Sequence, residues 1–271
     1  MRCLFCKQPS EASRSVEHIV PESLGNTEHV LPKGIVCDSC NNYFAREVEG
    51  PFLESLFIKE ARFKASIPSK RGVIPPMVGM HLQSQTLVQL IHADGDGAHS
   101  VAPLKETDNN RWVKGLGTSK SGTLIFPSGV PSDGRVTSRF VAKVGLEVLA
   151  ERVSDVTGGV DYLIDKPELE EVRRYARRGD NLDNWPVNVR TIYLPDSIFT
   201  DRGPEPYQVS HEHMIFLTEH DEYYIVIAIF GVEYALNLGG PEIDGYRTWL
   251  SRNEDRSPLY FGRQNEPHPS E

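Results

Sequence analysis

Two Cys-x-x-Cys pairs near the start of the chain constrain its fold more than any other feature. They are Cys3 with Cys6 and Cys37 with Cys40, and the 231 residues that follow contain no further cysteine. Each pair can direct two thiolates at one ion about 2.3 Å away, which is the tetrahedral arrangement that zinc prefers. Two redox-active pairs or two disulfides are alternatives, but neither explains why both pairs have the same spacing. We expect a structural zinc ion with no coordination position open for chemistry.

The segment between and after the pairs is typical of a strand, a loop, a second strand and a helix. Residues 16–20 predict a strand that ends at Pro21, and Gly34-Ile35-Val36 predict a second one. Asp38 or Ser39 can cap a helix that runs through Val48 and stops at Gly50-Pro51. This order has a histidine on the first strand and an asparagine in the first helical turn, between and just after the two cysteine pairs, which together are called the cysteine frame.

These residues carry a resemblance to a known family. Glu-His-Ile-Val-Pro at 17–21, followed by Cys-x-x-Cys-Asn-Asn at 37–42, resembles the HNH endonucleases, or ββα-metal (His-Me) fingers, in the branch framed by a four-cysteine zinc site. The likeness covers roughly residues 1–50. It implies that His18 is a general base and that Glu17 and Asn42 hold one divalent cation. Asn41 directly follows the last cysteine, where family members often have His or Asn, and is a further candidate.

The residue types suit hydrolysis of a phosphodiester bond. An imidazole, with an unperturbed pKa of about 6.5, can take a proton from water near neutral pH. Mg²⁺ or Mn²⁺ prefers oxygen ligands and stabilises the charge that develops on the phosphate and on the leaving oxygen. The resemblance implies products with 5′-phosphate and 3′-hydroxyl ends.

Two positions depart from the family pattern. Glu17 stands where relatives usually have Asp, so that ligand is one methylene longer. Relatives also commonly have a central Asn just before the second strand, whereas residues 28–32 contain none. His29, Asn26 or the backbone itself could take its place.

The charge distribution does not exclude a nucleic-acid partner. The net charge is −9, but residues 1–179 contain 23 basic and 22 acidic side chains, and residues 180–271 contain 6 and 16. The acidity therefore belongs to the last third. The longest apolar run, Tyr223–Val232, is too short for a membrane helix, and the first residues do not form a secretory signal, so we expect a cytoplasmic protein without a membrane partner.

The whole chain predicts an α+β protein: a zinc-framed ββα-metal finger followed by a larger α+β domain. We expect the finger and a following helix over 1–66, a linker over 67–79, an accessory domain over 80–264 and a flexible tail over 265–271. Strands are expected at 80–92, 111–116, 122–126, 187–194 and 208–218, helices at 137–153 and 167–178, and a hairpin at 223–238.

Three further patterns can be interpreted either as functional sites or as ordinary structural features. The basic residues of 51–71 can follow a DNA backbone or form a solvated helix face; they are Lys59, Arg62, Lys64, Lys70 and Arg71. The arginines of 173–178 can contact phosphate or pair with nearby acids. His211 and His213 share one strand face and could form a metal pair, but the sequence shows no third ligand.

The sequence thus predicts a metal-dependent endonuclease on nucleic acid, with DNA as the expected substrate. A double-strand break would require two copies, which makes a homodimer an option. The alternatives are a zinc-stabilised nucleic-acid-binding module and a protein-interaction module, both without catalysis.

Overall fold

The computed structural model of the protein describes residues 1–69, 72–92, 99–117, 122–180, 182–200 and 205–264. Helices and antiparallel sheets occur together in it, which confirms the α+β class. The chain forms two compact units: residues 1–53 with 131–271, and residues 54–130. Among the described residues, no helix is both long and apolar enough to cross a bilayer.

The first unit begins with a small hairpin and a segmented helix. Strands β1 (Glu17–His18) and β2 (Val30–Leu31) pair antiparallel, with Glu17 opposite Leu31 and His18 opposite Val30, and the short helix η1 (Glu22–Leu24) lies between them. Helix α1 (Asp38–Phe44) continues through a π-helical turn, η2 (Ala45–Glu49), into α2 (Gly50–Leu53). The order strand, loop, strand, helix is therefore the predicted one.

Two details of this segment differ from the sequence prediction. The second strand lies at 30–31 rather than 34–36, because the main chain of residues 34–37 is used by the cysteine frame: Leu4 N–H donates to the Ile35 carbonyl. The helix does not stop at Gly50-Pro51. Pro51 stands in the first turn of α2, where a missing N–H costs little, and the wider π turn precedes it.

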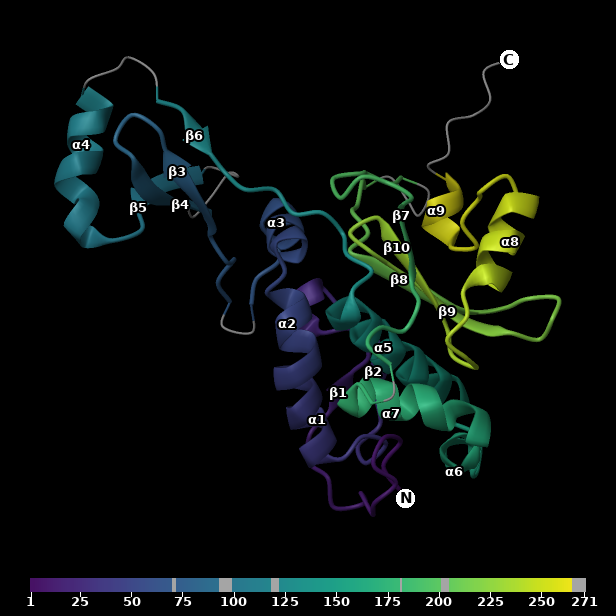
Figure 1. Ribbon diagram of the computed structural model, residues 1–271. Helices are drawn as coiled ribbons and strands as arrows, with labels where there is room; N and C mark the ends of the chain where they lie inside the picture. Colours follow the sequence, from purple (N-terminus) through teal and green to yellow (C-terminus); the bar gives the residue numbers. More distant parts are fainter. Residues whose placement is uncertain (70–71, 93–98, 118–121, 181, 201–204, 265–271) are drawn as a thin grey trace. The chain divides into compact units, whose positions relative to one another are not determined.

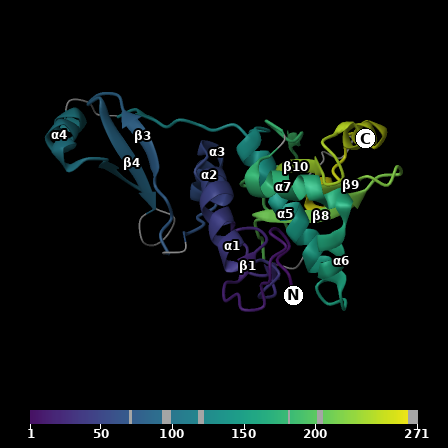
Figure 2. The same cartoon turned by 60° about the horizontal axis from the view of Figure 1, so that its bottom comes forward.

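The rest of the first unit is a four-stranded antiparallel sheet between helices. The strands are β7 (Asn188–Thr191), β8 (His211–Leu217), β9 (Tyr223–Ile229) and β10 (Val232–Asn237), in the order β7-β10-β9-β8. The long helix α5 (Arg135–Val153) lies against one face (Figure 1, Figure 2), and α6 (Gly159–Asp165), η4 (Pro167–Leu169) and α7 (Glu170–Arg178) follow it. Helices α8 (Asp244–Arg252) and α9 (Tyr260–Gln264) complete the unit.

Strand β9 is buried on both faces, which explains its apolar run. Tyr224, Val226 and Ala228 join a core with Tyr246 and Leu250 of α8. The alternate residues face α5, where Gly145 allows close approach: a Cβ there would meet Ile225 at 2.8 Å. The predicted helix at 137–153 and the hairpin at 223–238 are confirmed.

The second unit has its own sheet. It contains α3 (Leu56–Lys64), β3 (Met77–His81), β4 (Thr86–His92), β5 (His99–Pro103), η3 (Glu106–Asp108), α4 (Asn109–Gly117) and β6 (Leu124–Ile125), with strand order β5-β4-β3-β6. Residues 111–116, predicted as a strand, belong to helix α4, whose Trp112 contacts His81 with ring centroids 4.8 Å apart.

The boundaries of the two units differ from the expected domain boundaries. The sequence-based boundaries were 1–66, 67–79 and 80–264, whereas the contacts group 1–53 with 131–271. Burial explains this grouping, because Phe52 stacks on Phe140 of α5 with ring centroids 4.0 Å apart. The expected tail, 265–271, lies outside the described residues.

Candidate active site of the N-terminal finger

The four cysteines lie close together at the N-terminal end of helix α1. Their sulfur atoms all lie within 4.8 Å of one another, and Sγ of Cys6 is 3.7 Å from Sγ of Cys37. A tetrahedron with metal–sulfur bonds of about 2.3 Å has edges of about 3.8 Å, so the donor set fits one metal ion. Each of the four, all in the described part of the chain, is a free thiol. The cluster is that of a structural metal site.

Main-chain groups support this cluster. The N–H groups of Cys37 and Cys40 donate to the sulfurs of Cys3 and Cys37, both at 3.4 Å. The cap of helix α1 is therefore Cys37 itself, rather than Asp38 or Ser39. Asp38 has another use: its carboxylate accepts from the N–H of Ser15 at 2.8 Å, which ties the strand-bearing segment to the helix start. The frame thus fixes both ends of the segment that carries Glu17 and His18.

Asn26 holds the loop between the two strands. Its side chain is fully buried, and its amide nitrogen donates to the carbonyls of Val20 and His29 at 2.7 and 2.9 Å. Its amide oxygen accepts from the N–H groups of Glu28 and His29. Of the substitutes considered for a central asparagine, the structure therefore shows Asn26 in the loop-fixing position.

His18 lies on the strand face that does not bear Glu17, because neighbouring residues of a strand point to opposite faces. Its ring is half-buried, and within the described residues its Nδ1 atom is buried without a hydrogen-bond partner. The ring nitrogen is thus not engaged in a structural hydrogen bond.

Glu17 points into a buried cluster of charges. Nζ of Lys143, on helix α5, lies 2.6 Å from Oε1 of Glu17, 2.6 Å from Oε1 of Glu49 and 2.9 Å from Oε2 of Glu147. Lys143 and Glu147 are fully buried, and the Glu17 side chain is only 6% exposed. Nζ also reaches the main-chain carbonyl of His18, at 3.4 Å.

The protonation states in this cluster follow from burial and pairing. Burial raises the pKa of Glu17 and raises that of Glu147 well above its usual range, although Lys143 acts in the opposite direction. Burial alone would lower the pKa of Lys143, but the three carboxyl groups raise it well above its usual range. One ammonium therefore faces three carboxyl groups, and burial favours the neutral form of the Glu147 carboxyl group.

The two asparagines after the last cysteine have different surroundings. Asn41 is half-buried, and its Nδ2 atom donates to the carbonyl of Val16, the residue before β1, at 3.1 Å. Asn42 is exposed to solvent. The structure thus brings Asn41, and not Asn42, against the strand that bears Glu17 and His18.

Some of the predicted basic residues form ion pairs within their own unit. In the second unit, Lys59 pairs with Glu54, Lys64 pairs with Glu60 at 2.8 Å, and Arg62 is buried. Lys70 and Arg71 lie outside the described residues. In the first unit, Arg173 is buried and its NH1 atom lies 2.7 Å from Oε2 of Glu170. For Lys59, Lys64 and Arg173 these contacts favour a structural role over contact with phosphate.

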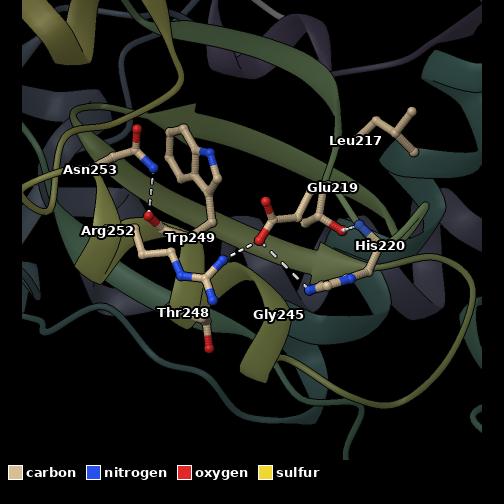
Figure 3. A pocket seen from close by; sticks show the side chains of 9 residues that line it. Leu217, Glu219, His220, Gly245, Thr248, Trp249, Arg252 and Asn253 are labelled. Atoms are coloured by element: carbon tan, nitrogen blue, oxygen red, sulfur yellow. Dashed lines mark hydrogen bonds and ion pairs between the residues drawn. The ribbon is translucent and has the colours of Figure 1, made fainter.

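A separate hollow of about 300 Å³ lies between the β8–β9 turn and helix α8. Figure 3 shows Glu219 between Arg252 and His220, and the amide of Asn253 bonded to the main chain of Trp249. The charged side chains here satisfy one another, and the lining residues all come from 217–253. This hollow contains no residue of the finger.

Fold and frame together define a ββα finger whose helix is anchored on a four-thiolate metal site. Residues 3–57 match the family model of the HNH endonucleases. No curated protein and no solved structure matches the chain. The resemblance predicted from the sequence is thereby confirmed for the N-terminal segment.

Sequence reasoning missed the residues that come from far along the chain. Lys143 and Glu147 lie on a helix that was predicted, but nothing in their local pattern indicates that they would meet Glu17. A lysine within the apolar stripe of 140–149 was the available signal, because a buried lysine requires an acidic partner.

Proposed function

We propose that this protein is a divalent-cation-dependent HNH endonuclease that hydrolyses phosphodiester bonds of nucleic acid, with DNA as its substrate. The observation that carries the proposal is the family match over residues 3–57, which coincides with the cysteine frame and the hairpin of His18. The free thiols are consistent with a reducing compartment, and the proposal places the protein in the cytoplasm.

His18 is the proposed general base. The hairpin is short, and its main chain is held on one side by the bond between Ser15 and Asp38 and on the other by Asn26, which positions the backbone of His18. Histidine is the residue that most often serves as general acid or base in enzymes, and within the described residues the Nδ1 atom of His18 is not used by a structural hydrogen bond.

Glu17 and an asparagine of the first helical turn are the proposed ligands of the cation. The fit rests on oxygen atoms: Lys143 contacts Oε1 of Glu17, which leaves the second carboxylate oxygen, and the amide nitrogen of Asn41 donates to Val16, which leaves Oδ1. Asn42 is the exposed neighbour and the ligand that the resemblance implies. A hard cation bound there would stabilise the charge of the phosphate.

Nicking of supercoiled plasmid tests the proposal. We expect the wild-type protein to nick DNA with Mg²⁺ or Mn²⁺ and His18→Ala to lose at least about a hundredfold in rate, the usual contribution of a general base. His220→Ala is the matched control, because His220 is an exposed histidine outside the finger. Undiminished nicking by His18→Ala would refute the assigned base, and duplex and single-stranded RNA in parallel assays would test the choice of DNA.

Oligomeric state requires its own measurement. One finger cleaves one strand, so an enzyme that breaks both strands would act as a homodimer. Sedimentation velocity with and without duplex DNA, compared with the ratio of nicked to linear plasmid, would relate the number of chains to the product.

A second function is favoured by one observation, the pairing of Glu17 with Lys143. The ammonium group of Lys143 occupies an oxygen of Glu17, the predicted ligand of the catalytic cation. This arrangement favours a zinc-stabilised module that binds nucleic acid or protein without catalysis. Such a module would bind DNA with a steep dependence on salt, would be indifferent to His18→Ala and would cleave under no metal.

A further inference from the structure

A second group of metal-ligating side chains lies in the first unit, away from the cysteines. Nδ1 of His29 is 3.0 Å from Oε1 of Glu151, and Nε2 of His213 is 3.8 Å from Oε2 of the same carboxylate. The imidazole rings of His29 and His213 have centroids 4.6 Å apart. One donor atom of each residue lies within 4.8 Å of the other two.

The three side chains come from three different elements. His29 directly precedes β2, and Asn26 binds both its N–H and its carbonyl, so its main chain is fixed. Glu151 lies in the last turns of α5, two turns beyond Lys143 on the same helix face. His213 lies on β8, the edge strand, opposite Ile227 of β9. Each ligand is thus held by regular structure or by a buried hydrogen bond.

A cavity of about 360 Å³ is lined by two of the three residues, His29 and His213, and gives room for a further ligand. Its lining includes His29, His211 and His213, and the ring centroids of His29 and His211 are 6.2 Å apart. The side chain of His213 is 7% exposed, and within the described residues its Nδ1 atom is buried without a hydrogen-bond partner. The other ring nitrogen of His213, Nε2, is the one that faces Glu151.

The donor set indicates which ion would bind. Two imidazole nitrogens and one carboxylate oxygen are a ligand set of zinc sites that keep a fourth position open. Donors of a tetrahedral zinc ion lie about 3.3 Å apart when the bonds are about 2.0–2.1 Å. The distances of 3.0 and 3.8 Å involve different oxygens of the Glu151 carboxylate, and one donor atom of each residue lies within 4.8 Å of the other two, so a small adjustment of the side chains would bring all three donors to one ion. Imidazole suits zinc and its neighbours in the first transition row, whereas magnesium prefers oxygen alone.

We propose that His29, Glu151 and His213 form a second metal site of this protein, which binds a divalent transition-metal ion such as zinc. The ion would join the loop of the finger hairpin to helix α5 and to the edge of the C-terminal sheet. His211 lines the same cavity and can complete the coordination together with a small ligand or water.

Metal analysis of the full-length protein tests this proposal without any cleavage assay. After equilibration with excess zinc and removal of free metal, we expect about two zinc ions per wild-type chain and about one per chain of Glu151→Gln and of His213→Ala. His220→Ala, the same substitution at an exposed histidine of the same unit, should keep two. Glu151→Gln preserves the side-chain shape and remains informative if His213→Ala fails to fold.

Cobalt substitution identifies the ligands of each ion. The cysteine site should give intense near-ultraviolet thiolate-to-cobalt charge transfer, and the second ion should add visible bands without increasing that absorption. Glu151→Gln should lose only the second component. A wild-type protein that binds a single ion, or a Glu151→Gln protein that still binds two, would overturn the proposal and leave His29 and Glu151 as an ion pair.

Discussion

The cysteine cluster and the His29–Glu151–His213 cluster lie in the same unit but are built in opposite ways. The cysteines lie within the first forty residues, in two tight turns whose own N–H groups bond to the sulfurs. The second cluster joins residues 122 positions apart, and its geometry exists only when the finger, α5 and β8 are packed together. The first can therefore organise local structure, and the second depends on structure already formed.

The buried charge cluster around Lys143, like the His29–Glu151–His213 cluster, joins distant segments of the chain. Glu17 and Glu49 come from the finger, and Lys143 and Glu147 come from α5. This contact makes the finger part of the larger unit rather than a separate domain. Substitutions in the local and the long-range clusters should consequently have different effects on the fold.

Cys40→Ser should have the largest effect. Zinc binding to such sites contributes on the order of 10–16 kcal/mol of apparent folding free energy, so losing a ligand should unfold the finger while the C-terminal sheet persists. Limited proteolysis should then cut within 1–53, and zinc content should fall. Ser39→Ala, at the exposed neighbouring position, is the control. Wild-type protease resistance in Cys40→Ser would show that the cluster does not organise the finger.

Lys143→Met should have the next largest effect. It leaves Glu17, Glu49 and Glu147 without their shared cation, and breaking a buried pair in this way costs about 3–5 kcal/mol. Urea unfolding of the variant measures the loss of free energy. Lys33→Met, at an exposed lysine of the finger, should change stability little. Equal stability of the two variants would contradict the inferred role of the cluster.

Glu147→Gln should have the smallest effect, and this effect should be a change in how the free energy of unfolding depends on pH. Burial raises the pKa of Glu147 well above its usual range in the folded protein, whereas a glutamate of the unfolded chain releases its proton above about pH 4.3. The stabilisation is complete below that pH and is lost as the pH rises towards the raised pKa. The free energy of unfolding of the wild type, relative to that of Glu147→Gln, should therefore fall as the pH rises above about 4.3, with a slope of at most about 1.4 kcal/mol per pH unit. Urea unfolding at several pH values measures this, and parallel profiles would contradict it.

The same contrast explains what the sequence could predict. The cysteine spacing, the Glu17-His18 dipeptide and the first helical turn are local patterns, and they indicated the finger correctly. The sequence placed Asn41 and Asn42 at the helix start, but only the hydrogen bond to Val16 distinguishes them.

The features that the sequence did not predict depend on packing between distant segments of the chain. His211 and His213 were visible as a pair on one strand face, but their partners His29 and Glu151 lie in distant segments. The apolar residues of 111–116 were mistaken for a strand, although Trp112 and Leu116 are also one helical turn apart. Such ambiguities are resolved by the neighbours that a segment meets in the fold, as Trp112 meets His81.

Anomalous X-ray scattering at the zinc absorption edge, on crystals grown with zinc and washed free of it, tests the comparison most directly. The account predicts two peaks per chain, one equidistant from the four sulfur atoms and one between His29, Glu151 and His213. A single peak at the cysteines, with no density between the imidazoles, would contradict the claim that the folded unit assembles a second metal site.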